Sequence, residues 1–142
     1  MGALRSSGRA CGSVAAAALE VRDDLVCEMD GREVVGFAVL RRSEDADADR
    51  LTGELDLIYT APSVWGSGVG RTLMGAALDH LRAAGYREAT LWTAEANERP
   101  RQFYELTGWS LDGAQRSRTA LGAALTEVRY RIGLSSVTVE GS

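Results

Sequence analysis

Residues 57–72 read LIYTAPSVWGSGVGRT, and this stretch decides the fold. An apolar run ends at a proline, and Gly66, Gly68 and Gly70 then occupy alternate positions. Glycine has no Cβ, so it adopts positive φ at little cost and lets a ligand lie against the backbone. A helix that begins directly after such a loop offers unpaired N–H groups and the positive end of its dipole. The segment up to Thr72 therefore predicts an anion site suited to a diphosphate.

Three phosphate-binding patterns compete for this loop. A P-loop requires a Gly-Lys-Ser/Thr step after four spacer residues, and the loop contains no such lysine. The dinucleotide fingerprint is G-x-G-x-x-G, whereas the third glycine here comes one residue early, and no acidic residue follows at the required spacing. The third candidate, the pyrophosphate arm of coenzyme A, remains.

Periodicity on both sides of the loop predicts a single α/β domain with a mixed sheet and helices packed on it. A strong Asp30-Gly31 turn signal joins the first two expected strands. The linker 112–125 is expected to be a loop, and the Asp-rich segment 43–50 a solvated turn rather than a calcium loop. The expected strands are 25–29, 34–39, 53–60, 90–93, 109–111 and 128–134. The first expected helix begins at Val69 and stops at Gly85. The second begins at Glu98 or Arg99, with Pro100 in its first turn, and ends at Gly108.

A second block, NERPRQFY at residues 97–104, follows the glycine loop and is closed by Gly108-Trp109. The two blocks together resemble the GNAT superfamily of N-acetyltransferases. Their signature Gln/Arg-x-x-Gly-x-Gly/Ala is similar to the loop here, with Trp65 where Gln or Arg is usual. Their N-x-x-A-x-x-F-Y pattern is similar to the second block, with Pro100 in place of alanine. The resemblance covers residues 25–134 and implies the GNAT fold: a mostly antiparallel sheet with splayed central strands and reduced N-terminal helices.

The resemblance implies how acetyl-CoA would bind. Backbone N–H groups of the glycine loop would hold the pyrophosphate, and the splayed strand edge would pair with the pantetheine arm. Asn97 would contact the cofactor or cap the second helix. Trp65 would shield the cofactor or pack the loop. The expected cofactor-binding residues are Ile58, Tyr59, Thr60, Trp65, Gly66, Ser67, Gly68, Val69, Gly70, Arg71, Thr72, Asn97 and Arg101.

The resemblance also implies the chemistry, in which an amine attacks the thioester directly. Tyr104 would be the general acid for the CoA sulfur, and its alternative role is a core aromatic. Glu54 would be the general base, with Asp56, Glu95 or a water as alternatives. Phe103 and Trp92 are expected in the core, and His80 is expected to be structural.

The implied function is an acetyl-CoA-dependent N-acetyltransferase acting on a primary amine of a small molecule or peptide. The alternative is a non-catalytic CoA-binding or interaction module, and a nucleotide-binding oxidoreductase is disfavoured by the glycine spacing. The family implies pairing as a homodimer. No metal is expected, because one histidine and two cysteines, Cys11 and Cys27, are too few for a structural zinc site.

Composition narrows the classes of protein to which the chain can belong. The chain has 142 residues, a net charge of -4 and 45% hydrophobic residues, which is typical of a globular domain. An acidic chain is a poor general nucleic-acid binder, and no apolar stretch is long enough to span a membrane. Both thiols are expected to be free in a reducing compartment, so the expected location is cytoplasmic. We expect a short or loosely ordered segment at 1–22, which could hold a helix at 13–19, the catalytic domain at 23–135 and a tail at 136–142.

Overall fold

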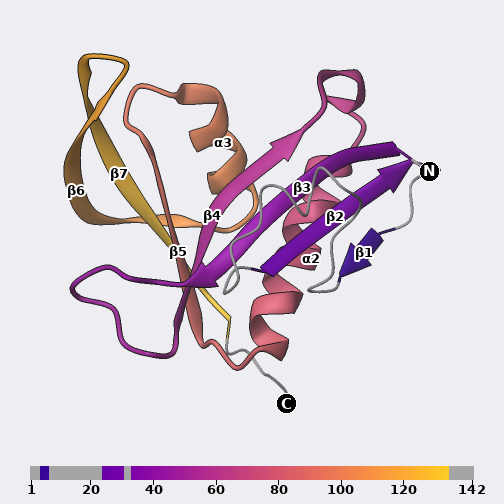
Figure 1. Ribbon diagram of the computed structural model, residues 1–142, viewed down its shortest axis with the longest axis horizontal. Helices are drawn as coiled ribbons and strands as arrows, with labels where there is room; N and C mark the ends of the chain where they lie inside the picture. The colour runs from indigo at the N-terminus through magenta and orange to yellow at the C-terminus, as the bar shows by residue number, and fades with distance from the viewer. Residues whose placement is uncertain (1–3, 7–23, 31–32, 135–142) are drawn as a thin grey trace.

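The computed structural model describes residues 4–6, 24–30 and 33–134, which form an α/β fold (Figure 1). In chain order the elements are β1 (Leu4–Ser6), β2 (Asp24–Asp30), β3 (Glu33–Arg42), β4 (Thr52–Thr60), the 3-10 helix η1 (Pro62–Val64), α2 (Val69–Ala83), β5 (Glu88–Ala94), α3 (Glu98–Leu106), β6 (Ser110–Ala120) and β7 (Ala123–Gly133). The predicted succession of strands and helices from β2 onward is confirmed. The three-residue strand β1 was not predicted.

The strands form a sheet in the order β1-β2-β3-β4-β5-β7-β6, in which only β4 and β5 are parallel neighbours. Their pairing is short, because it joins residues 52–54 of β4 to residues 88–90 of β5 and then stops. Beyond this point β4 continues to Thr60 and β5 to Ala94, and Figure 1 shows the two strands diverging. The predicted splay of the central strands is therefore present, and Glu54 is the last β4 residue paired with β5.

A bulge in β4 coincides with the start of the splay. Val39 of β3 lies opposite Leu57, but the next residue, Leu40, lies opposite Leu55, so Asp56 is an extra residue. The bulge reverses which side chains face the helices: Leu55 is in the core before it, and Ile58 packs against the core after it. The far end of β4 is thereby turned relative to its paired end.

The core lies between the sheet and the two α-helices. Helix α2 buries its apolar stripe completely, whereas α3 contributes the half-buried rings of Phe103 and Tyr104. Gly85 adopts φ 99° after α2, and the Tyr86 N–H donates to the Leu81 carbonyl, which is the bonding pattern of a glycine-terminated helix. The largest buried core side chains include Leu40, Leu73, Met74, Leu81, Leu91, Tyr130 and Leu134.

The prediction of a loop at residues 112–125 is wrong. These residues belong to the long antiparallel hairpin β6–β7, which turns at Leu121 and Gly122, both with positive φ. Most side chains from Gln115 to Thr126 are exposed, so the sequence lacks the alternation of apolar and polar residues that identifies a half-buried strand. The strand pairing here comes from the backbone ladder that continues from the buried part of β7.

The solvated turn expected at 43–50 is also only partly correct, because two of its carboxylates, Asp45 and Asp47, are ion-paired. Arg129, whose side chain is 7% exposed, lies 3.1 Å from Asp45, 2.7 Å from Asp47 and 2.7 Å from Asp112. These contacts tie the 43–50 loop to the β6–β7 hairpin. We call Arg129 and its three aspartates the Arg129 cluster.

Trp92 belongs to this polar region and not to the core, which corrects the prediction. Its neighbours Leu91 and Thr93 are buried, and Leu91 faces the helices, so alternation directs Trp92 to the opposite face of the sheet. Its indole N–H donates to Asp45 at 3.1 Å, and the Arg116 guanidinium lies 4.2 Å from the ring centroid. A tryptophan in the core, Trp109, is 2% exposed.

Some sequence-based expectations lie outside the described residues. They are the segment at 1–22 apart from β1, the helix at 13–19, the turn at Gly31, the tail at 136–142 and the thiols of Cys11 and Cys27. Among the described residues, no helix has the length and apolar character needed to cross a bilayer.

Candidate active site

The glycine-rich loop between β4 and α2 has the backbone that its sequence predicts. Gly66 has φ 82° and Gly68 has φ 93°, which are conformations that residues with a Cβ rarely adopt. Gly68 is the N-cap of α2, and no side chain caps this end of the helix. Thr72 is the first residue whose N–H bonds back into the helix, to the Gly68 carbonyl at 3.1 Å.

Several backbone N–H groups of this loop have no acceptor among the residues that the structure describes. They belong to Gly66, Gly68, Gly70 and Arg71. The Val69 N–H has only a long contact of 3.4 Å with the Ser67 hydroxyl. Unsatisfied amides at the positive end of a 15-residue helix form a site that favours an anion.

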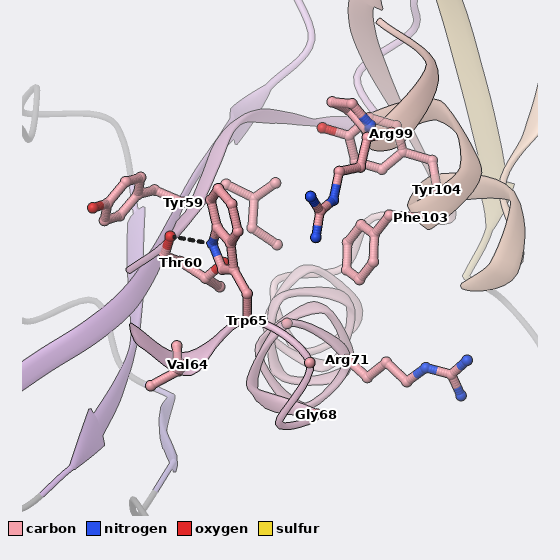
Figure 2. A pocket seen from close by; sticks show the side chains of 13 residues that line it. Tyr59, Thr60, Val64, Trp65, Gly68, Arg71, Arg99, Phe103 and Tyr104 are labelled. Atoms are coloured by element: carbon pink, nitrogen blue, oxygen red, sulfur yellow. Dashed lines mark hydrogen bonds between the residues drawn. The ribbon is translucent and has the colours of Figure 1, made fainter. Parts of the chain in front are cut away.

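A cavity of about 650 Å³ extends from this loop toward α3, between β4 and α3 (Figure 2). It brings together most of the predicted cofactor-binding residues with the predicted acid. Its lining consists of Ile58, Tyr59, Thr60, Val64, Trp65, Gly66, Gly68, Gly70, Arg71, Arg99, Pro100, Phe103 and Tyr104. Five predicted residues are not part of this lining: Ser67, Val69, Thr72, Asn97 and Arg101.

Four lining residues, Val64, Arg99, Pro100 and Phe103, were not predicted to bind the cofactor. Three of them lie on α3, where Arg99 and Pro100 precede Phe103 and Tyr104 by four positions each. This i, i+4 spacing puts them on one helix face with Tyr104. The spacing was available in the sequence, but it identifies a face without saying what that face contacts.

The approach of α2 to α3 depends on the third glycine of the loop. A Cβ on Gly70 would lie 3.3 Å from Cε1 of Phe103, which is tighter than ordinary packing. Phe103 therefore both packs against the core, as predicted, and forms a wall of the cavity. Gly70 has a packing role in addition to any ligand contact.

Tyr104 lines the cavity from α3 and is half-buried. Its ring is 5.8 Å from that of Phe103 and 5.9 Å from that of Tyr130. Burial raises the pKa of the Tyr104 hydroxyl above its usual value of 10.0, because the phenolate would lose hydration. Within the described residues this hydroxyl makes no hydrogen bond, so it is available to a bound molecule.

Arg101 and Asn97 lie at the start of α3 and do not line the cavity. Arg101 Nε donates to the Tyr130 hydroxyl at 2.9 Å, and its Nη1 donates to the Glu95 carbonyl at 2.7 Å. The Tyr130 hydroxyl in turn donates to Glu105 at 2.7 Å. Asn97 is the N-cap of α3, but its side chain makes no capping bond. Arg101 thus attaches α3 to the sheet.

Glu54 lies at the point where β4 and β5 separate and does not line the cavity. It is 5% exposed, and desolvation raises the pKa of its carboxyl above 4.5, while the Arg41 guanidinium at 3.6 Å opposes the shift. Asp56 is more exposed and lies 3.4 Å from the same guanidinium. The nearby Thr90 hydroxyl, on the β5 residue paired with Glu54, is buried without a partner among the described residues.

The remaining candidates lie away from the cavity. Glu95 is exposed at the end of β5, and His80 is half-buried in the last turn of α2. No cluster of three or more His, Cys, Asp or Glu side chains suited to a metal ion occurs in the described part of the chain.

Comparisons with known proteins agree with this geometry. The family model described as acetyltransferase (GNAT) family matches residues 14–109. An uncharacterised N-acetyltransferase from Mycobacterium tuberculosis is 33% identical over 99 residues, which are 70% of this chain and 58% of that protein. The chain therefore spans little more than half the length of this curated relative.

Two solved structures show the same fold at low sequence identity. A Salmonella typhimurium protein solved with its cofactor acetyl-CoA superposes with a TM-score of 0.69 at 20% identity, covering 82% of this chain and 67% of that one. The ribosomal-protein-S18-alanine N-acetyltransferase from Escherichia coli gives a TM-score of 0.68 at 17% identity, covering 87% and 76%. On the strength of the family match over residues 14–109, this chain belongs to the acetyltransferase (GNAT) family.

Proposed function

We propose that the chain is an acetyl-CoA-dependent N-acetyltransferase that transfers an acetyl group to a primary amine. One observation carries the proposal: a single cavity joins the unpaired amides of the glycine loop to the hydroxyl-bearing ring of Tyr104. The first end suits a pyrophosphate and the second suits a thiolate leaving group. An extended ligand with a phosphate at one end and a thioester at the other matches both.

The donor would lie along the free edge of β4. Beyond Glu54 this edge has no strand partner on the β5 side, so the backbone of residues 58–60 can pair with the amides of a pantetheine arm. The pyrophosphate would accept hydrogen bonds from the amides of Gly66, Gly68, Gly70 and Arg71. We assign no donor contact to Arg101, because its guanidinium is already bonded to Tyr130 and Glu95.

The transfer would be a direct displacement at the thioester carbonyl. The amine nitrogen forms the new C–N bond, the C–S bond breaks, and the CoA sulfur takes a proton from the Tyr104 hydroxyl. A tyrosine hydroxyl is protonated at neutral pH, and burial moves the pKa of Tyr104 further above its usual 10.0, so the proton is present when the thiolate leaves.

The proton of the attacking ammonium would pass to Glu54, through water. Its burial favours the neutral carboxyl, which makes the carboxylate a stronger base than an exposed one. The acceptor would be a small molecule or peptide whose amine is cationic before reaction, since the two carboxylates of Glu54 and Asp56 share the single guanidinium of Arg41 and can attract a further cation.

Calorimetric titration with acetyl-CoA, and separately with NADH, tests the donor assignment. We expect binding of acetyl-CoA alone, followed by release of free thiol when a panel of amines is added. Failure to bind acetyl-CoA would overturn the proposal. Binding without turnover of any amine would favour a non-catalytic CoA-binding module.

A pH profile tests Glu54. We expect the rate to fall as pH drops through the raised pKa of Glu54, so the acid limb should lie above 4.5. Glu54→Gln should remove this limb and lower the rate by about a hundredfold, the usual contribution of a general base. Asp56→Asn is the matched control, because Asp56 contacts the same arginine from an exposed position; an unchanged limb in Glu54→Gln would exclude Glu54.

A further inference from the structure

Trp65 and Arg99 meet across the cavity from two different elements. Trp65 follows η1 in the glycine loop, and Arg99 lies in the first turn of α3. The Arg99 guanidinium carbon lies 4.8 Å from the centroid of the Trp65 ring, and both residues line the cavity (Figure 2). The pair is therefore a contact between the loop and α3 at the place where a ligand would lie.

Arg99 has no ion pair with a carboxylate among the described residues, although α3 is rich in charge. The other arginine of this helix, Arg101, is two positions along, which turns it by about 200° to the opposite side. Arg101 donates hydrogen bonds to the Tyr130 hydroxyl and to the Glu95 carbonyl, so its guanidinium has a structural role. Arg99 instead presents an unneutralised cation to the cavity.

Trp65 is held in place for this contact. Its indole N–H donates to the Thr60 carbonyl at 3.1 Å, which fixes the plane of the ring. The side chain is nevertheless 55% exposed, so burial of apolar surface does not explain its position. Its ring face supports the Arg99 guanidinium, and a contact of this kind at an exposed site contributes only about 0.5–1 kcal/mol.

A second cation lines the same cavity. Arg71 lies in the first turn of α2, is exposed, and makes no ion pair within the described chain. Arg71 extends its guanidinium away from Trp65 and Arg99 (Figure 2), so Arg99 is the arginine that meets Trp65 across the cavity, beside the free amides of the glycine loop. A charge-assisted hydrogen bond from a guanidinium to phosphate is stronger than a cation–π contact, so a phosphorylated ligand would capture Arg99.

We infer that Arg99, positioned by the ring of Trp65, binds a phosphate group of the donor and completes the anion site from the side of α3. The inference rests on the proposed function, in which the donor is a CoA thioester. It also bears on a departure from the family signature, because the loop carries Trp65 where Gln or Arg is usual, and a cation from another helix lies over the ring of Trp65. The donor offers two phosphate sources, the pyrophosphate and the 3′-phosphate.

Binding of acetyl-CoA and of 3′-dephospho-acetyl-CoA to Arg99→Gln, followed by calorimetry at several salt concentrations, tests the inference. We expect Arg99→Gln to weaken acetyl-CoA binding about tenfold and to reduce its salt dependence, because one charge-assisted bond is lost. Equal weakening for both ligands would identify the pyrophosphate as the partner. Weakening for acetyl-CoA alone would identify the 3′-phosphate.

The matched control is Arg87→Gln, which removes the same charge from an exposed arginine beyond the far end of α2. It should leave both affinities within about twofold, since a 15-residue helix separates it from the loop by about 22 Å. If Arg99→Gln matches Arg87→Gln for both ligands, the inference is overturned while the proposed function stands. If the unsubstituted protein binds neither ligand, the proposed function itself fails.

The role of Trp65 is tested by a double-variant comparison. Trp65→Leu should weaken acetyl-CoA binding less than Arg99→Gln does. The fold-loss of affinity in the combined variant should be smaller than the product of the two single fold-losses, because the Trp65 ring acts only by positioning Arg99. Arg99→Lys should recover part of the affinity, since the charge returns without the planar fork. Independent, multiplicative losses would show that Trp65 does not position Arg99.

Discussion

Two tryptophans of this protein lie under arginines, and their surroundings differ sharply. Trp92 lies beneath Arg116 and Arg129, and both guanidinium groups are ion-paired: Arg116 with Glu127, and Arg129 with Asp45, Asp47 and Asp112. Trp65 lies beneath Arg99 alone, with no carboxylate partner among the described residues. The arginines of the first region have carboxylate partners, whereas Arg99 has none in the described part of the chain.

The difference separates a structural role from a binding role. In the Arg129 cluster three carboxylates surround the guanidinium and fasten the 43–50 loop to the hairpin, so no positive charge remains for an anionic ligand. In the cavity the cations and the loop amides remain unneutralised, which costs stability in the empty protein but leaves them available to an anion. Substitutions in the first region should change folding, and those in the second should change binding or turnover.

The largest expected effect is on stability. Arg129→Met should lower the free energy of unfolding by about 3 kcal/mol, because it leaves three aspartates without their shared, nearly buried partner. Urea denaturation measures this. Arg99→Met is the matched control and should change stability by no more than about 0.5 kcal/mol. Equal destabilisation by the two variants would erase the distinction between the regions.

Turnover should be the next most sensitive quantity. Tyr104→Phe should reduce kcat by about a hundredfold, because the thiolate would leave without its proton donor. The affinity for acetyl-CoA, measured by calorimetry, should stay within about twofold, since the ring remains in place beside Phe103. An unchanged kcat would remove Tyr104 as the acid and leave it as a packing residue.

A smaller effect is expected on donor affinity when the loop backbone is strained. Gly68→Ala places a Cβ at φ 93°, which should shift the loop amides and weaken acetyl-CoA binding about tenfold. Gly113→Ala is matched to it, because Gly113 has φ 91° and equally open surroundings, but it lies in β6 away from the cavity. Comparable loss of affinity in both variants would show that strain acts globally.

The smallest effect concerns acid pH. The hydrogen bond from Arg129 lowers the pKa of Asp47 from 3.8 to about 2. A carboxyl whose pKa is depressed by folding contributes stability above its unfolded value, and this contribution disappears as pH falls from about 4 to 2. Stability to urea should therefore decline over this range, and Asp47→Asn should reduce the decline. If the decline of stability with falling pH is the same in Asp47→Asn, solvent screens the ion pair between Asp47 and Arg129.

Helices and strands with clear turn residues and regular apolar spacing were predicted correctly, and those without them were missed. The helix α2 was foreseen at both ends, because Gly68 and Gly85 mark its termini and its apolar stripe repeats at helical spacing. The β6–β7 hairpin was missed, because its exposed residues carry no periodic apolar pattern and its Leu121-Gly122 turn lacks the usual Asn-Gly or Asp-Gly signal. The strand β1 is too short to give any signal.

The residues of the candidate site also fall into those that the sequence could identify and those that it could not. Gly66, Gly68 and Tyr104 were identified because the backbone and the aromatic ring each sit within a recognisable local block. Of the two arginines in the first turns of α3, Arg101 was predicted from the sequence to bind the cofactor, whereas Arg99 is the one that lines the cavity. Only the packing of α3 against β7 decides that Arg101 reaches Tyr130 while Arg99 faces the cavity.

The sequence by itself determined the family, the glycine loop and the succession of elements from β2 onward, because these depend on short-range spacing and backbone preference. The tertiary structure alone decided which charges neutralise one another and which remain open. Trp92 and Trp65 show why: their residue type is the same, but the partners that surround each come from strands, loops and helices far apart in the chain. Charge pairing across such distances depends on chain folding and leaves no pattern in local sequence.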